Sequence, residues 1–180
     1  MSFLKRDPLA NPDALIRRVY AYAAYRLGDG PDAEDVTSEV FERAVRYRDS
    51  YDRSKGEPVA WLLGIASRCA SSALAARAGD QPSPDESVPS IGFEDDSVRR
   101  LSLAAALAQL SERDQELIAL RYGADLTAAQ IARVVDSKTN AVEVALHRAL
   151  ERLRSILETE DEHETAALTA VAVERSPEAA

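Results

Sequence analysis

Apolar residues recur at helical spacing along most of this chain, and proline and glycine divide the pattern into segments. Residues 12–27, 31–46 and 59–77 each carry apolar side chains every three to four positions, as the buried face of a helix does. Proline opens the first two segments, at the position where a helix accepts it. Three helices are therefore predicted in the first half, with a polar and aromatic loop at residues 47–58.

The second half contains two helix-start patterns. Ser111-Glu-Arg-Asp114 and Thr127-Ala-Ala-Gln130 both resemble a capping box, which predicts helices to Tyr122 and to about Val135. A helix over 99–110 precedes them, and a longer helix over 140–158 follows a turn. A short helix, a turn and a longer helix form a helix-turn-helix, which places its second helix in the DNA major groove or serves as a plain packing unit.

The predicted fold class is all-α, with two small helical domains at residues 1–78 and 98–158. Residues 79–97 hold three prolines and six acidic side chains without a basic one, which predicts a flexible acidic linker. Residues 159–180 are also acidic and predict a disordered tail, with room for a short helix over 165–173. The terminal Ala179-Ala180 resembles endings that bacterial proteases recognise.

Composition removes several classes of protein. Aromatic residues make up only 6% of the chain, so the core must be aliphatic. A single cysteine, Cys69, excludes an internal disulfide framework, and two distant histidines argue against a metal site. No cofactor, metal or enzymatic activity is expected, since the acidic residues match no metal-binding or phosphate-loop motif. The longest uncharged stretch, residues 101–111, is too short to span a bilayer, and a cytoplasmic protein is predicted.

The net charge of −9 argues at first against a nucleic-acid partner. The excess of acid lies in residues 79–97 and 159–180, however. Each predicted helical domain is close to neutral, with basic and acidic residues nearly balanced. Binding to nucleic acid is therefore not excluded, and the acidic segments fall outside the predicted domains.

Five segments together resemble the extracytoplasmic-function sigma factors of bacterial RNA polymerase. The first domain shows the resemblance in residues 32–44 and in Ala60-Trp61-Leu62; the second shows it in residues 110–122, in Ile131-Ala132 and in residues 146–154. The resemblance covers about residues 12–158, in the order and spacing of conserved regions 2 and 4. It implies a factor that binds core RNA polymerase and promoter DNA, with an anti-sigma factor as a further candidate partner and without membrane insertion.

The resemblance also implies three sets of site residues. For polymerase binding by the second helix they are Asp32, Asp35, Val36, Glu39, Glu42 and Arg43. For the −10 element they are Tyr47, Tyr51, Arg53, Lys55, Trp61, Arg68, Ser72 and Arg77, of which the loop aromatics and bases suit stacking on unpaired bases. For the −35 element they are Thr127, Gln130, Lys138, Thr139, Asn140, Glu143, Val144 and Arg148.

Each set has a plainer interpretation. Asp35 and Glu39 could be an ordinary solvated helix face, Trp61 a core side chain, and Glu143 a partner for protonated His147. The third helix carries few basic residues, and Glu143 stands where many relatives have lysine. A second hypothesis is therefore a sigma-like decoy or regulator that binds polymerase or an anti-sigma factor without reading promoters.

Overall fold

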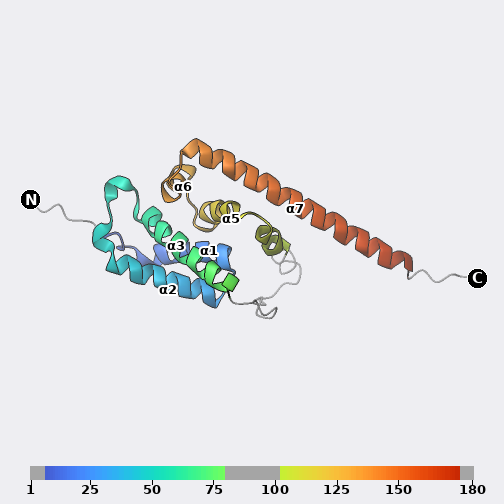
Figure 1. Ribbon diagram of the computed structural model, residues 1–180, viewed down its shortest axis with the longest axis horizontal. Coiled ribbons are helices and arrows are strands. Elements are labelled where there is room, and N and C mark those ends of the chain that lie inside the picture. The colour runs from blue at the N-terminus through green and yellow to red at the C-terminus, as the bar shows by residue number, and fades with distance from the viewer. Residues whose placement is uncertain (1–6, 80–101, 175–180) are drawn as a thin grey trace, which may run out of the picture.

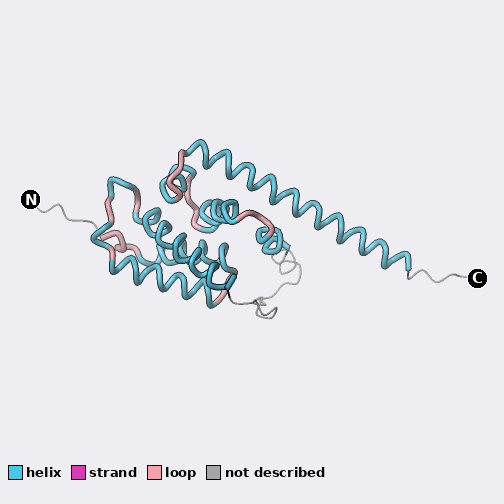
Figure 2. Tube along the Cα trace, in the orientation of Figure 1, coloured by secondary structure: helices cyan, strands magenta, loops and turns pink. Residues whose placement is uncertain are grey.

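Helices dominate the computed structural model, which describes residues 7–79 and 102–174 of the chain. Figure 2 shows loops between the helices and no strand in the described ranges. The predicted all-α class is confirmed. Besides a helical segment at residues 102–108, the helices are α1 (Pro12–Leu27), α2 (Pro31–Arg46), α3 (Pro58–Gly79), α5 (Glu112–Ile118), α6 (Ala128–Val134) and α7 (Thr139–Glu174).

Proline and glycine set the bounds of the first two helices. Pro12 and Pro31 lie in the first turns of α1 and α2, where the missing N–H costs nothing. Between the helices, Gly28 and Gly30 adopt φ angles of 91° and 136°, which favour glycine. Asn11 precedes α1 as predicted, although its side chain makes no capping hydrogen bond.

Side-chain caps fix the helix starts in the second half. Ser111 accepts a hydrogen bond from the amide of the third residue of α5, and Thr127 and Gln130 form the full reciprocal capping box at α6. Both predicted helix starts are confirmed. The helix predicted to reach Tyr122 changes character on the way, because one π turn, η3 (Ala119–Gly123), follows α5.

The last helix is longer than predicted. α7 extends to Glu174 and projects well beyond the other helices (Figure 1). The prediction of a disordered tail from residue 159 was therefore wrong for residues 159–174. This segment has no glycine or proline and is rich in alanine and glutamate, so helix propagation continues from the well-packed first turns. Ala179 and Ala180 lie outside the described residues, as do residues 80–97 of the predicted linker and the first four residues, 98–101, of the predicted second domain.

One apolar core runs through both halves of the chain. α1 packs against η3, and α3 packs against α6, so the second half lies on the first (Figure 1). Fully buried members of this cluster come from both sides, among them Val19, Leu62, Leu120, Leu126 and Ile131. The sequence predicted two domains and gave no sign of this contact.

α3 is the central helix of this core. Its residues Pro58–Arg77 have a mean hydropathy of 1.4, which meets the length and composition criteria for a membrane span. The helix contacts α1, α2 and α6, and its Leu62, Leu63 and Ala66 are completely buried. Its apolar composition is accounted for by this central position.

A buried ion pair joins α5 to α7. Asp114 is 5% exposed and accepts hydrogen bonds from Arg152 Nε at 3.0 Å and Nη2 at 2.9 Å. Because both Asp114 oxygens are satisfied by one guanidinium, removing Arg152 leaves a buried carboxylate without its charged partner.

We expect Arg152→Ala to lower the free energy of unfolding by about 1.5 kcal/mol, the lower end for charged hydrogen bonds, because Arg152 itself is half exposed. Urea unfolding followed by circular dichroism measures the change. The matched control is Arg154→Ala, whose one ion pair among the described residues is with exposed Glu158. An equal loss of unfolding free energy in the two variants would contradict a stabilising role for the ion pair between Arg152 and Asp114.

Candidate polymerase and nucleic-acid interfaces

The exposed face of α2 carries four of the six residues predicted to bind polymerase. Asp35 and Glu42 are exposed, while Glu39 and Arg43 are partly exposed and form an ion pair at 2.5 Å. The four lie one or two helical turns apart and therefore share one face. The result is a mixed-charge surface opposite a fully buried side at Val40.

The other two predicted polymerase contacts have different surroundings. Val36 is 4% exposed and belongs to the core, so its prediction as a surface contact was wrong. Val36 follows Asp35 directly in the sequence, but the turn of the helix puts its side chain on the buried side of α2. Asp32 forms an ion pair with Arg77 of α3.

That pairing also explains the position of Arg77, which was predicted to bind the −10 element. Arg77 Nη1 donates to the carbonyl oxygen of Leu27 at 2.9 Å, satisfying the C-terminal end of α1. Along α3, Arg77 lies about 28 Å from Pro58, where the predicted stacking loop ends. Arg68 and Ser72 are exposed on the intervening turns, so the structure does not gather these three residues with the loop.

The loop between α2 and α3 contains two short helical turns, η1 (Arg48–Ser50) and η2 (Arg53–Lys55). Arg53 and Lys55 are exposed in η2, and Tyr47 is 55% exposed at the end of α2. The Asp52 side chain accepts a hydrogen bond from the Ser54 amide at 2.9 Å and so fixes the start of η2. With exposed Arg48 of η1, the loop therefore presents one aromatic ring and three cations to solvent.

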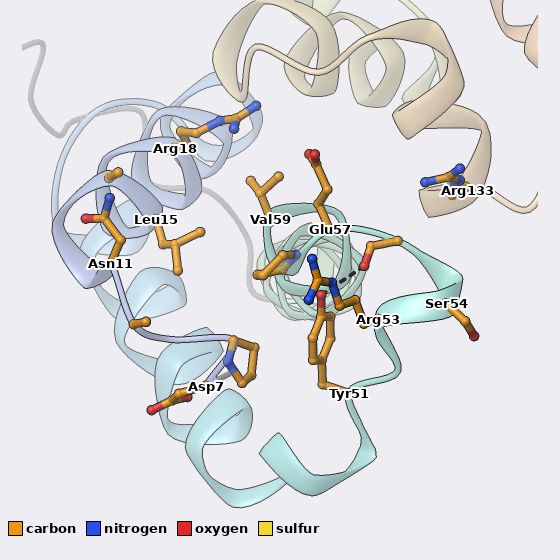
Figure 3. A pocket seen from close by; sticks show the side chains of 15 residues that line it. Asp7, Asn11, Leu15, Arg18, Tyr51, Arg53, Ser54, Glu57, Val59 and Arg133 are labelled. Carbon is orange, nitrogen blue, oxygen red and sulfur yellow. Dashed lines mark hydrogen bonds between the residues drawn. The ribbon is translucent and has the colours of Figure 1, made fainter. Parts of the chain in front are cut away.

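Tyr51 does not take the exposed position that the sequence predicted. It is 9% exposed, and its hydroxyl donates to the Gly56 carbonyl oxygen at 2.9 Å (Figure 3). Its ring lies tilted against partly buried Trp61, with centroids 5.5 Å apart. Burial raises the pKa of Tyr51 above its ordinary value. Both aromatic side chains hold the loop in place, and the predicted stacking ring at Tyr51 was wrong for this arrangement.

A cavity of about 630 Å³ lies beside this loop and is lined by side chains from both halves of the chain. Arg53 of the loop, Arg18 of α1 and Arg133 of α6 border it, together with Glu57 (Figure 3). Sequence reasoning missed Arg18 and Arg133. No local pattern could have found them, because only the packing of α6 near α1 and the loop brings them to one cavity.

The first turns of α7 present most of the residues predicted to read the −35 element. Asn140, Glu143, Val144 and Arg148 are exposed. Their spacing of three to four residues puts them on one face of the helix. Buried Val142, Leu146 and Ala149 occupy the opposite face, and Lys138 and Thr139 are exposed beside the helix start. The structure therefore gathers these six predicted residues on one surface.

Thr127 and Gln130 are occupied by the α6 capping box. Gln130 Nε2 also donates to Glu57 Oε2 at 2.7 Å, which ties α6 to the loop before α3. His147 Nε2 lies 3.4 Å from Glu151 Oε1 and forms no ion pair with Glu143 within the described ranges. Glu143 is exposed, as are Asn140 and Arg148.

Among the described residues, no group of histidine, cysteine, aspartate and glutamate side chains could hold a metal ion. Cys69 is fully buried in the core, and burial raises the pKa of its thiol.

Both halves of the chain match known protein families. The model of sigma-70 region 2 matches residues 13–79, and the model of sigma-70 region 4 matches residues 100–153. The chain is 34% identical to the ECF RNA polymerase sigma factor SigD of Mycobacterium tuberculosis over 151 residues, 76% of this chain and 70% of that protein. It is 32% identical to the ECF sigma factor BldN of Streptomyces coelicolor over 153 residues, 77% of this chain and 56% of that protein.

A solved structure shares the fold. The sigma factor RpoE of Bartonella quintana, crystallised with the anti-sigma factor NepR, superposes with a TM-score of 0.65 at 21% identity. The match covers 80% of this chain and 92% of that one.

Proposed function

This chain belongs to the extracytoplasmic-function family of RNA polymerase sigma factors, and we propose that its first half reads the −10 element and its second half the −35 element. Its activity is that of an alternative sigma factor, which directs promoter-specific transcription. It lends sequence specificity to the polymerase and performs no chemistry of its own. We place it in the cytoplasm, where polymerase and promoter meet.

The observation that carries this proposal is the surface at the start of α7. Asn140, Glu143, Val144 and Arg148 are exposed there at helical spacing. The asparagine amide can pair with adenine, and the glutamate carboxylate can accept a hydrogen bond from cytosine. The valine can contact a thymine methyl group, and the arginine guanidinium can donate to guanine. The helix that carries them begins at a tight turn after α6, as the second helix of a helix-turn-helix does.

The −10 assignment is supported by the loop between α2 and α3. Exposed Tyr47 offers a ring for stacking on an unpaired base, and Arg53 and Lys55 supply charge for the backbone. The polymerase assignment is supported by the charged face of α2, where Asp35 and Glu42 are exposed opposite the buried side of the helix.

In vitro transcription with core polymerase tests the function as a whole. Promoter-specific runoff with the full chain supports the proposal. Binding of core polymerase without runoff at any promoter would favour the decoy instead. A genome-wide binding map would supply the promoters for this assay.

We expect Tyr47→Ala to slow open-complex formation about tenfold on a duplex promoter, because stacking on one aromatic ring contributes about 1–3 kcal/mol. The defect should be smaller on a template melted in advance. The matched control is Tyr122→Ala, which removes another half-exposed ring, 52% exposed, from the second half. Wild-type rates for Tyr47→Ala on both templates would argue against stacking.

An anti-sigma factor is a candidate third partner. One solved structure that shares this fold is a complex of a sigma factor with an anti-sigma factor, the RpoE–NepR complex. Copurification of the full chain from its own cells, followed by mass spectrometry, would identify such a protein.

A further inference from the structure

The cavity beside the loop between α2 and α3 has the lining of a site for a small anion. Three arginines border it, each from a different element: Arg18 from α1, Arg53 from η2 and Arg133 from α6 (Figure 3). A guanidinium presents its N–H groups in a planar fork that matches the oxygens of phosphate and carboxylate groups. Like charges around one space repel each other, and an anion bound between them offsets that repulsion.

The three arginines keep hydrogen-bond donors for a ligand. Within the described ranges none of them forms an ion pair. Arg18 donates from Nε and Nη2 to the carbonyl oxygens of Ala124 and Asp125, both at 2.7 Å, which leaves its Nη1 group for another acceptor. Arg133 reaches from α6 to the loop, where its Nη1 atom lies 3.6 Å from the position that a Cβ atom at Gly56 would take.

The two carboxylates of the lining are held by neutral donors. Asp7 Oδ1 accepts a hydrogen bond from the Leu9 amide at 3.0 Å, and Glu57 Oε2 accepts one from Gln130 Nε2 at 2.7 Å. Three guanidiniums and two carboxylates leave the lining with a net positive charge. An anion is therefore the favoured occupant, and the carboxylates can accept hydrogen bonds from its hydroxyl groups.

The rest of the lining suits the other parts of a nucleotide. Buried Leu15 and Val59 supply apolar surface for a flat ring. The Asn11 side chain makes no capping hydrogen bond, and Glu57 Oε1 is not used by Gln130, so both can bind sugar hydroxyls. The volume of about 630 Å³ lies within the range of small-molecule sites. A nucleoside phosphate combines the anion, the hydroxyls and the ring that this lining accepts.

Apolar packing between the two halves of the chain forms the walls of the cavity in advance. Val19 of α1, Leu62 of α3 and Ile131 of α6 are completely buried in one cluster. Arg18 directly precedes Val19, and Arg133 follows Ile131 by two residues, so the core fixes the segments from which both arginines project. A site that is already formed loses less conformational freedom when a ligand binds.

We propose that this cavity binds a nucleoside phosphate, with the phosphate between the arginines and the base against Leu15 and Val59. A strand of DNA also carries phosphates, but it needs a groove that is open at both ends. α1, α6 and the loop border this cavity together, which suits a small molecule. The bound nucleotide contacts both halves and stabilises the folded chain by mass action. The site does not depend on the function proposed above.

Titration calorimetry of the full chain with AMP, in a buffer without phosphate, tests the site. We expect one AMP per chain and about tenfold weaker binding by Arg133→Gln, which loses charge-assisted hydrogen bonds to the phosphate. The matched control is Arg113→Gln, which removes the same charge from an exposed position of α5 outside the cavity. Its affinity for AMP should equal that of wild type.

A second pair of variants tests the other half of the chain. Arg53→Gln should also weaken AMP binding about tenfold, whereas Arg48→Gln, an exposed arginine of the same loop outside the lining, should not. Circular dichroism shows that each variant is folded, and the two cavity variants lie in separate elements. Adenosine and inorganic phosphate, each lacking one part of the nucleotide, should both bind at least tenfold more weakly than AMP.

Four results would overturn the proposal. They are no binding of AMP at millimolar concentration, equal AMP affinity in wild type and both cavity variants, adenosine binding as tight as that of AMP, and inorganic phosphate binding as tight as that of AMP. A hexathymidylate provides a further comparison. If its binding falls in Arg133→Gln while AMP does not bind, the arginines serve single-stranded DNA and the proposal fails. These titrations contain no polymerase or promoter, so their failure is distinct from failure of the proposed function.

Discussion

Replacing Asp35 and Glu39 together by arginine is expected to weaken binding to core RNA polymerase by about a hundredfold or more, because reversing charges in a complementary interface costs several kcal/mol. Both carboxylates project from the exposed face of α2, and the Glu39 side chain is 43% exposed. Within residues 7–79 and 102–174, the change breaks one partly exposed ion pair, Glu39 with Arg43, which contributes little to stability. The melting temperature should therefore shift by only a few degrees.

A pull-down of core polymerase with the double variant measures this loss. The matched control is Asp13→Arg with Glu112→Arg, two exposed carboxylates in the first turns of α1 and α5. It raises the net charge by the same amount, so a general electrostatic effect would appear in both proteins. Undiminished capture of core by the α2 variant would rule out this helix face as the docking surface.

Local features of the fold could be predicted from the sequence because their causes are local. Thr127 and Gln130 lie three residues apart and cap one helix by contacting each other's backbone, so their pattern suffices. Gly28 and Gly30 end α1 through backbone conformations that few other residues adopt. The exposure of Asn140 and Arg148 could be predicted because their helical spacing puts them on the side of α7 opposite buried Leu146.

The burial of particular site residues depended on packing that spacing does not reveal. Tyr51 sits in a polar loop, yet its ring fills the space beside Trp61 and its hydroxyl finds the Gly56 carbonyl oxygen. Val36, by contrast, lies on the buried side of α2 that the helical spacing itself indicates, and it belongs to the core. For Tyr51, the position of Trp61 in α3 beside the loop decides that the ring is covered.

The contact between the halves was beyond any sequence pattern. Tyr22 and Glu116 are 94 residues apart, and each is an ordinary member of an amphipathic helix. Arg18 donates to the carbonyl oxygens of Ala124 and Asp125, just after η3. Every residue has a carbonyl oxygen, so no residue type in the sequence marks these two as acceptors. The charge balance of the two halves, both near neutral, also leaves no sign of attraction between them.

The second large effect is expected from a substitution in the exposed surface at the start of α7, which is proposed to read the −35 element. Arg148→Ala should weaken binding of the polymerase complex to its promoter by about 1–3 kcal/mol, roughly fivefold to 150-fold, if Arg148 pairs with a base. That loss would appear at some −35 sequences and not at others. If Arg148 contacts only phosphate, the loss should be uniform across sequences, and the salt slope should fall by about 0.9. Arg154→Ala is the control, since Arg154 lies on a different face of α7 and pairs with Glu158.

Glu143→Lys tests the same surface in the opposite direction. A carboxylate in the major groove repels phosphates and is favourable only where a cytosine amino group meets it. Lysine at this exposed position should therefore raise affinity for nonspecific DNA and reduce the preference for one −35 sequence. Runoff transcription from a set of promoters that differ only in the −35 element measures both variants. Should Arg148→Ala and Glu143→Lys both initiate at the same promoters as wild type with equal efficiency, α7 does not read DNA, and the decoy becomes the better account of this chain.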